Sequence, residues 1–573
     1  MEPRARQAVV AELRRALEAL GLPVPEELGL EPPRRPEHGD LSSNVALVLA
    51  RTLGRPPRAL AEEIAARIDR AAAGLAAVEV AGPGFLNFRF EDRVWWEALR
   101  ALLAAGDAYG RSDVGGGTKI MVEFVSANPT GPLHIGHGRQ AALGDAISEL
   151  LAWTGWSVHR EFYYNDAGEQ IERLARSVWA RYQQHFGRSV AVPPEGYHGA
   201  YVAEIATDFA AEVGDRYVDD ASPEALEAMR RFAVARLRDE QNRDLEAFRV
   251  RFDEFFLESS LYTSGKVAET IERLRATGLV YEKDGALWLR TTAFGDDKDR
   301  VMVKRTGQPT YFLPDVAYHL TKWERGFRHA INVMGADHHG TIARVRAALR
   351  ALGLPPDYPE YVLHQMVTVV RGGEEVKFSK RAGDYVTLRE LVDEVGVDVA
   401  RYFFLERRAD AHLTFDLDLA LDQSERNPVY KIQYAHARMC SIFRRAGRAP
   451  TELDIAAAPL HRLVHPLERG LLRELVRLPE EIRAAAAERA PHRMCSYLEA
   501  LANAVNAWYH AGNRDRSLRV LGVEPELSEA RMALARAVQI TLRNGLAVLG
   551  IAAPERMARL EEEEATPEAA PAP

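Results

Sequence analysis

Cysteine is almost absent from this chain of 573 residues, which contains only Cys440 and Cys495. The two lie far apart and show no paired cysteine–histidine spacing of the kind that holds zinc. The sequence therefore predicts neither a disulfide framework nor a structural zinc site. We expect both cysteines to be buried, because a free cysteine behaves as a small apolar residue.

Long hydrophobic runs are also missing. No stretch approaches the roughly 18–20 uninterrupted apolar residues of a transmembrane helix. The charged N-terminus MEPRARQAVVAELRRAL lacks a secretory apolar region. We therefore expect no membrane span and a cytoplasmic location. The net charge of −9 argues against non-specific coating of nucleic acid, although local basic patches can still bind RNA.

The length indicates several domains, because single cores rarely exceed about 250–300 residues. Residues 1–20 show helical spacing, and residues 77–90 alternate around a Gly-Pro-Gly turn, which favours a β-hairpin. From about residue 395 the pattern is almost wholly helical until an acidic, Pro/Ala-rich end. We predict a small α/β domain at 1–105, a doubly wound α/β domain at 106–390 with a helical insertion at about 167–290, and a helical domain at 391–573 with a disordered acidic tail from about 560.

A βαβ unit opens the second domain. The apolar run 120–125 reads as a buried strand, a Gly/Pro turn follows, a helix begins near Gly136, and 156–166 reads as the next strand. This order is typical of a Rossmann-type nucleotide-binding sheet. Strand and loop signals return at 286–340, including YFLPDVAYHL, and VLHQMVTVV at 362–370 reads as another buried strand.

The sharpest chemical signal is GPLHIGHGR at 131–139, between the first strand and its helix. A helix N-terminus offers free N–H groups and a positive dipole end to phosphate. His134 and His137 can face one site there and stabilise a phosphate as its charge develops. Gly136 between them allows close approach of a nucleotide. The alternatives are a metal pair or two incidental surface histidines.

A second signal is VKFSKRAGDYVTL at 376–388. The chain has only nine lysines, so the position of each is informative, and two of them, Lys377 and Lys380, flank Ser379 here. A mobile cationic loop suits the β and γ phosphates of ATP and the departing pyrophosphate. The alternative is a solvated charged turn. The presence of the first motif in the same chain favours the phosphate-binding interpretation over this alternative.

Several acidic and polar residues stand near these motifs in the predicted fold. Carboxylates that converge beside an ATP site would suit a cationic substrate, and a planar guanidinium accepts bidentate pairing. Each acid alone could equally be a surface or capping residue. The candidates are Glu123, Asn128, Tyr311, Asp315 and Asp337.

These motifs carry a family resemblance. LHIGH and KFSKR resemble the HIGH and KMSKS signatures of class I aminoacyl-tRNA synthetases, with Phe378 and Arg381 as mild departures. Longer segments resemble the arginyl-tRNA synthetase family in particular, and they run over nearly the whole chain. They are VEFVSANPTGPLHIGHGR, NPVYKIQYAHARMCSI, DVARYFFL, NGLAVLGIAAPERM, GDLSSNVA and GPGFLNF.

The resemblance implies an enzyme that activates L-arginine with ATP and Mg²⁺ and esterifies it to tRNA(Arg), acting as a monomer. It also implies a tRNA-elbow contact by the first domain and anticodon binding by the third, and it raises the hypothesis that activation requires bound tRNA. By position it assigns His134, His137, Lys377, Ser379 and Lys380 to catalysis, Gly136, Gly335 and His338 to ATP, Glu123, Ser126, Asn128, Tyr311, Asp315 and Asp337 to arginine, and Phe85, Asn87, Tyr434, Arg438, Tyr509 and Met557 to tRNA.

The RNA contacts are less sharply indicated. Residues 426–448 are strongly basic, with interleaved tyrosines that could stack on unpaired bases. Tyr434 and Phe443 can equally be helix core, and we favour that interpretation.

Other functions fit the sequence less well. A cysteinyl enzyme would need zinc ligands, and a glutamyl enzyme would present basic residues to its substrate. A non-catalytic RNA-binding paralogue would not be expected to keep both motifs. A small nucleotidyltransferase would lack the large helical domain.

Overall fold

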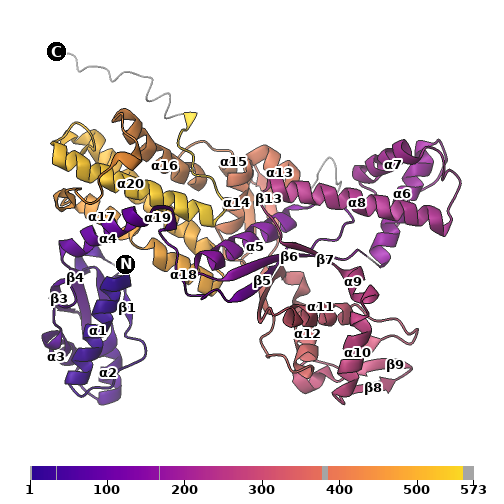
Figure 1. The fold of residues 1–573 in the computed structure, drawn as a ribbon, viewed down its shortest axis with the longest axis horizontal. Coiled ribbons are helices and arrows are strands. Elements are labelled where there is room, and N and C mark those ends of the chain that lie inside the picture. Colours follow the sequence, from indigo (N-terminus) through magenta and orange to yellow (C-terminus); the bar gives the residue numbers. More distant parts are fainter. Residues whose placement is uncertain (1–2, 34, 167, 377–384, 559–573) are drawn as a thin grey trace, which may run out of the picture.

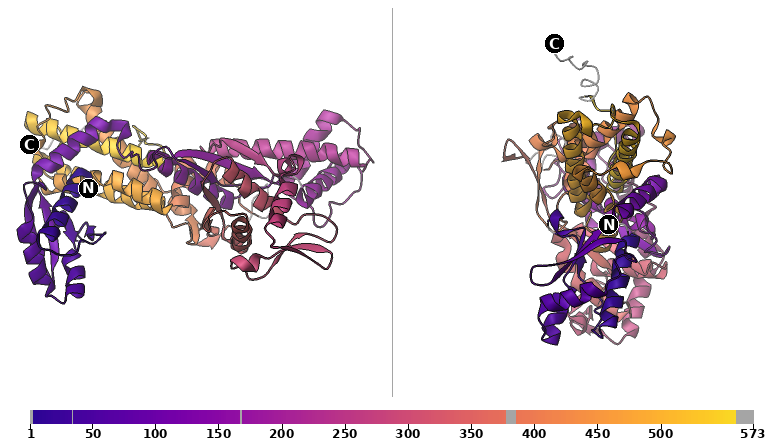
Figure 2. Two further views of the ribbon diagram at one scale, coloured as in Figure 1. Left: turned by 60° about the horizontal axis from the view of Figure 1, so that its bottom comes forward. Right: turned by 90° about the vertical axis from the view of Figure 1, so that its left-hand side faces the viewer.

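The computed structural model describes residues 3–33, 35–166, 168–376 and 385–558, and the molecule is elongated (Figure 1). Its N-terminal module and an inserted helical group lie at opposite ends of a central parallel sheet (Figure 2). Within these residues no helix is long and apolar enough to cross a membrane. The predicted tail from about 560 and the residues Lys377, Ser379 and Lys380 lie outside the described ranges.

The N-terminal module contains a four-stranded antiparallel sheet in the order β1-β2-β4-β3. The predicted hairpin is confirmed as β3 and β4, and the predicted first helix is α1. The elements are α1 (Pro3–Ala19), β1 (Leu30–Glu31), β2 (Leu41–Ser43), α2 (Val45–Leu53), α3 (Pro57–Arg67), β3 (Leu75–Ala81) and β4 (Phe85–Phe90), followed by α4 (Asp92–Ala105).

The central sheet has five parallel strands in the order β12-β11-β5-β6-β7. Ile120 and Val122 of β5 join the core that contains α5, whereas Met121 joins the core of α11 and α12. Apolar residues thus cover both faces, as in a doubly wound sheet, and the predicted fold class is confirmed. The elements are β5 (Lys119–Glu123), α5 (Ile135–Trp153), β6 (Ser157–Tyr164), β7 (Glu254–Leu257), α11 (Phe312–Glu324), β11 (His329–Gly335), α12 (His339–Ala351) and β12 (Glu360–His364).

The order of these strands indicates where a ligand would bind. From β5 the chain runs outward to β6 and β7, and it later returns to the other side of β5 with β11 and β12. The direction of winding reverses between β5 and β11. Ligands of such sheets bind outside the carboxyl ends of the strands at this point.

Two smaller groups extend from the sheet. Three helices form an insertion with its own core, and a three-stranded antiparallel sheet lies below the central sheet (Figure 1). The insertion is α6 (Glu169–His185), α7 (Ala200–Val213) and α8 (Pro223–Ala247); the second group is α9 (Glu258–Thr263), α10 (Lys266–Ala276), β8 (Val280–Lys283), β9 (Ala286–Leu289) and β10 (Arg300–Val303).

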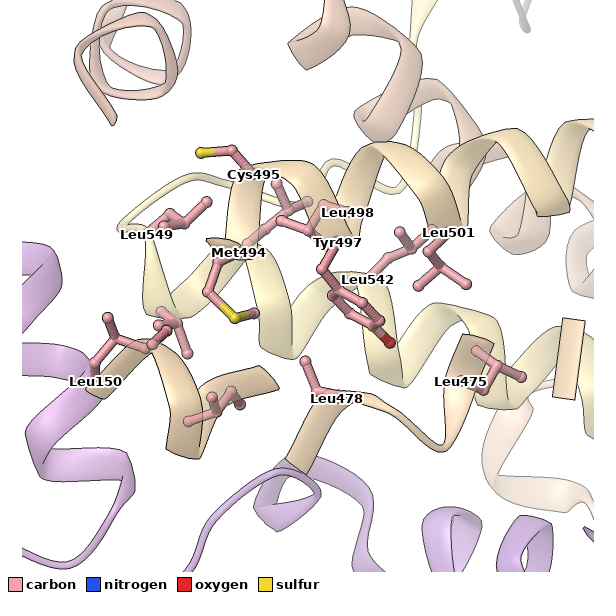
Figure 3. Packing of buried hydrophobic residues seen from close by; sticks show 14 of the residues in the cluster. Leu150, Leu475, Leu478, Met494, Cys495, Tyr497, Leu498, Leu501, Leu542 and Leu549 are labelled. Carbon is pink, nitrogen blue, oxygen red and sulfur yellow. The ribbon is translucent and has the colours of Figure 1, made fainter. Parts of the chain in front are cut away.

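The C-terminal part is joined to the central sheet by a continuous core. Figure 3 shows Leu150 of α5 in the same cluster as Leu478, Leu498 and Leu542 of three later helices. Cys495 is buried in this cluster, Cys440 is partly buried, and both are free thiols. The elements are β13 (Val367–Arg371), β14 (Glu374–Glu375), α13 (Leu388–Val395), α14 (Val397–Leu405), β15 (Leu413–Asp416), α15 (Leu417–Ala420), α16 (Pro428–Arg445), α17 (Pro466–Leu475), α18 (Leu478–Glu488), α19 (His492–Arg514) and α20 (Pro525–Val548).

Several elements differ from the sequence-based expectation. The edge strand β7 falls inside the stretch predicted as a helical insertion, because its four residues give too short a signal. The segment YFLPDVAYHL is not a strand but the start of α11, whose buried Leu313, Val316 and Leu320 have helical spacing. The predicted strand 362–370 is divided between β12 and β13, which belong to different sheets, and the intervening Met366 is 77% exposed.

Candidate active site

The loop before α5 is held against the segment that follows the predicted lysine loop. The N–H of Ile135 donates to the carbonyl of Val386 over 3.2 Å, and the N–H of Leu388 donates to the carbonyl of Leu133 over 2.8 Å. The hydroxyl of Tyr385 donates to the carbonyl of Pro132 over 3.3 Å. The two motifs, far apart in the sequence, are therefore joined at the carboxyl edge of the sheet.

His134 and His137 form a reciprocal cap at the start of α5. The N–H of His137 donates to Nδ1 of His134 over 3.2 Å, and the N–H of His134 donates to Nδ1 of His137 over 3.3 Å. Their rings stack with centroids 3.6 Å apart. Burial lowers the pKa of His134, and burial together with His134 lowers the pKa of His137 well below its usual range.

The reciprocal cap decides which ring nitrogen carries the proton. Each Nδ1 accepts a hydrogen bond, so each neutral ring carries its proton on Nε2. The pair therefore presents two uncharged N–H donors at a helix N-terminus, where the dipole already favours an anion. Gly136 is needed for this arrangement, because a Cβ there would lie 2.8 Å from Cε1 of His134.

A cluster of carboxylates lies at the same edge of the sheet. Glu123 ends β5, Glu258 begins α9 and Asp315 lies in the first turn of α11. Burial and the charges of Glu123 and Glu258 raise the pKa of Asp315 to about 7, and Lys322 and Arg344 offset this only in part. Burial also raises the pKa of Glu258. The cluster is short of positive charge, so a cation would be stabilised there.

One buried cation belongs to the protein itself. Nζ of Lys322 donates to Oε2 of Glu123 over 2.5 Å and to Oδ1 of Asn332 over 3.0 Å, and Nδ2 of Asn332 donates to the same Glu123 oxygen over 2.7 Å. The hydroxyl of Ser126 donates to the other oxygen, Oε1, over 3.0 Å. Sequence reasoning missed Lys322, although it is one of few lysines and stands two helical turns after Asp315.

The residues predicted to bind arginine have different surroundings in the structure. Glu123, Ser126 and Asp315 lie in or beside the acidic cluster, and Tyr311, which is 69% exposed, lies one turn before Asp315. The Nδ2 atom of Asn128 donates to Oε1 of Gln170 over 2.6 Å.

The remaining predicted residues follow β11. The Asp337 side chain is 80% exposed, and its charge opposes the lowering of the pKa of His134. Asp337 therefore lies on the histidine side of the site, next to His338, which is also exposed. The Asp337 carboxylate lies directly against Gly335, in the space that a Cβ would occupy.

Comparison with known proteins identifies the family. The model of the class I tRNA synthetase (R) catalytic domain matches residues 98–423, the arginyl tRNA synthetase N-terminal domain matches 7–90, and the DALR anticodon binding domain matches 432–557. An arginine–tRNA ligase of Geotalea uraniireducens is 53% identical over 536 residues, covering 92% of this chain and 94% of that protein. The chain belongs to the arginyl-tRNA synthetase family. This membership excludes the cysteinyl, glutamyl and nucleotidyltransferase alternatives.

Further relatives agree with this assignment. The arginine–tRNA ligase of Thiobacillus denitrificans is 50% identical and covers 95% of this chain and 97% of its own. The arginyl-tRNA synthetase structure from Thermus thermophilus matches with a TM-score of 0.74 and 26% identity, over 96% of this chain and all of that one. The family resemblance drawn from the motifs is thus confirmed over all three parts of the chain.

In the N-terminal module, Phe85 and Asn87 line a cavity of about 640 Å³ together with Arg35 and His38. Phe85 is 39% exposed. Asn87 is buried, and its Oδ1 accepts a hydrogen bond from the Ser42 hydroxyl over 2.8 Å. The arrangement offers an open ring and a fixed amide on one concave face of the module.

In the helical part, the predicted contacts Tyr434 and Arg438 are buried. The Arg438 guanidinium lies between two rings, 4.4 Å from that of Tyr434 and 4.3 Å from that of Tyr509. Tyr434 also joins a small apolar cluster with Met557. Tyr434 and Phe443 are core residues, as we favoured from the sequence, while Tyr509 and Met557 remain partly exposed.

Proposed function

We propose that this site activates L-arginine with ATP and then esterifies it to the 3′-terminal adenosine of tRNA(Arg), which is the reaction of an arginine–tRNA ligase. The observation that carries the proposal is the acidic cluster around Asp315, which lies at the same edge of the central sheet as the paired histidines. One part of the site suits a cation, and the adjoining part suits phosphate.

The guanidinium of arginine supplies the positive charge that the acidic cluster lacks. Asp315 is its main partner, and Tyr311, Ser126, Asn128 and Asp337 complete the contacts around the substrate. Glu123, whose charge is balanced by Lys322, shapes the wall of the pocket. A planar fork can pair with two acceptors at once, whereas a lysine side chain would leave acceptors unpaired, so the site discriminates between the two.

ATP enters as its Mg²⁺ complex. The Nε2–H groups of His134 and His137 donate to the phosphate oxygens, and Gly136, Gly335 and His338 lie against the nucleotide. The arginine carboxylate attacks the α-phosphorus, and pyrophosphate leaves with the electron pair of the broken bond. Most of the acceleration comes from positioning and from stabilised charge. The residues Lys377, Ser379 and Lys380 hold the departing pyrophosphate.

In the second step a ribose hydroxyl of the terminal adenosine attacks the activated carbonyl, and AMP leaves. Phe85 and Asn87 contact the tRNA elbow, and Tyr509 and Met557 contact the anticodon loop. Tyr434 and Arg438 act indirectly, because they hold the ring of Tyr509 in place. The chain works as a monomer in the cytoplasm.

The test is ATP–pyrophosphate exchange with each of the twenty amino acids, with and without tRNA. Exchange that depends on arginine alone is the expected result, and its appearance only with tRNA would establish tRNA-dependent activation. Exchange with another amino acid would overturn the assignment of the acidic cluster. No exchange under any condition would favour a non-catalytic RNA-binding protein.

A further inference from the structure

The helix α8 connects the inserted helices with both nucleotide-binding segments. The part of α8 up to Leu237 contributes Met229, Ala233 and Leu237 to the core of the insertion. Its last turn contributes Leu245 to the main core, which also contains α5. A single helix of 25 residues therefore belongs to two cores, and Figure 1 shows it running from the insertion toward the central part of the molecule near α13.

Near its C-terminal end, α8 binds the loop between β5 and α5. The buried Gln241 side chain donates through Nε2 to the carbonyl of Asn128 over 3.1 Å and to that of Gly131 over 2.9 Å. A neighbouring helix adds a third contact, from the Tyr201 hydroxyl to the carbonyl of Thr130 over 2.8 Å. This loop holds no regular structure of its own, so its path to His134 depends on these donors.

One turn later, α8 binds the segment that follows the lysine loop. The carboxylate of Asp244 accepts two hydrogen bonds from Arg389 of α13, over 2.9 and 2.5 Å. Asp244 is 6% exposed. Residues three apart lie on one face of a helix, so Gln241 and Asp244 form a rigid pair that contacts both segments.

We propose that Gln241 and Asp244 are positioning residues for arginine activation: they fix the loop of the paired histidines and the segment after the lysine loop relative to each other. Neither contacts the reacting atoms. The inference rests on the proposed function and deepens it, because it gives the insertion a role in catalysis. A displacement of one segment by about 1 Å can lower a rate by about a hundredfold.

The experiment compares Gln241→Leu, Asp244→Asn and the double variant in arginine-dependent ATP–pyrophosphate exchange with tRNA present. Glu246→Gln is the matched control, because Glu246 is exposed on the same helix and its substitution also removes one charge. Asp244→Glu is the conservative variant, since it keeps the charge that pairs with Arg389. Melting temperature and the KM for arginine are measured for every variant.

We expect kcat to fall by about tenfold to a hundredfold in Gln241→Leu and in Asp244→Asn. The KM for arginine should match that of the control, and Asp244→Glu should recover most of the activity. Loss of these buried hydrogen bonds lowers the stability, so all rates are measured well below the melting temperature of every variant. The double variant should lose less than the product of the single losses, because both residues hold the same geometry.

Wild-type turnover in both single variants would overturn the inference, and so would rate losses that are accounted for by the fraction of unfolded protein at the assay temperature. Exchange that is absent in the wild-type chain itself would instead overturn the proposed function, and the inference with it.

Discussion

Nζ of Lys322 lies 2.5 Å from Oε2 of Glu123, and the lysine is completely shielded from solvent. The negative charge of Glu123 is therefore balanced inside the protein before any substrate arrives. The attraction for a cationic substrate must come chiefly from the other carboxylates of the cluster, Asp315 and Glu258. Because of Lys322, Glu123 has a structural role in the site, whereas Asp315 and Glu258 attract the substrate.

Replacing Lys322 by methionine should destabilise the protein. It would leave Glu123 buried without its partner, and removing one member of a buried ion pair costs about 3–5 kcal/mol. We expect a clear fall in melting temperature for Lys322→Met. The double variant Glu123→Gln/Lys322→Met should recover much of it, because no unpaired charge remains. A single variant as stable as the wild-type chain would contradict this account.

Arginine binding should weaken as the pH falls below 7. The raised pKa of Asp315, about 7, means that the carboxyl group takes up a proton in this range and loses its attraction for the guanidinium. For one coupled proton the loss approaches about tenfold in affinity per pH unit. Calorimetric titration with arginine between pH 6 and 8 measures this, with Asp315→Asn as the control that removes the dependence. Equal affinities at pH 6 and pH 8 would refute the assignment.

The ionisation of Asp315 should lower the stability of the fold, although it strengthens the binding of arginine. The pKa of this carboxyl group in the folded chain lies above the ordinary value of 3.8 for an aspartate, so the folded state holds the proton more tightly than the unfolded state. The stability that this proton provides is present below about pH 4 and is lost as the pH rises through 7. Asp315→Asn should therefore raise the melting temperature at pH 8 relative to wild type, and the difference should vanish at low pH. A variant less stable at pH 8 would show that the charge has a partner.

Much of the fold could be predicted from local patterns. The first βαβ unit, the N-terminal hairpin and the C-terminal helices each have a strong period or turn signal, and all are found in the structure. Short elements were missed because four residues carry too little pattern, as at β7. The helix α11 was misread because aromatic residues and Pro314 obscured its helical spacing.

The site was predictable where motifs mark it and not where contacts cross the fold. His134 and His137 stand out by their place before a helix, but their reciprocal cap and proton positions depend on three-dimensional geometry. Lys322 lies more than a hundred residues from Glu123, which it contacts, and Gln241 lies more than a hundred residues from Asn128. Nothing local in the sequence pairs them with Glu123 or Asn128, so only the tertiary structure could identify them.

Removing either histidine should slow activation strongly. His134→Asn and His137→Asn each delete an N–H donor to the phosphates, and loss of one such donor costs about 10²–10³ in kcat. Because burial lowers the pKa of both rings, they stay neutral above pH 6.5, and the wild-type rate should show no histidine titration between pH 7 and 9. Exchange kinetics over this range measure both effects. His185→Asn, at an exposed position, is the control and should match wild type.

The two tyrosines on either side of Arg438 should behave differently. Tyr434 is 1% exposed, so Tyr434→Ala opens a cavity and should cost about 3–5 kcal/mol, as for other large aromatic residues. Tyr509 is only partly buried, so Tyr509→Ala should leave the melting temperature closer to that of wild type. It should raise the KM for tRNA by the equivalent of about 1–3 kcal/mol, the value of one base stacked on an aromatic ring.

Thermal melting and aminoacylation kinetics with varied tRNA separate these two effects. Asn503→Ala, an exposed change on the same helix as Tyr509, should alter neither quantity. If Tyr509→Ala lowered the melting temperature as much as Tyr434→Ala and left the KM for tRNA unchanged, Tyr509 would be a core residue like its neighbour. The anticodon contact would then have to lie elsewhere, with Met557 as the next residue to test because it packs beside Tyr434 and Tyr430 at the edge of the same cluster.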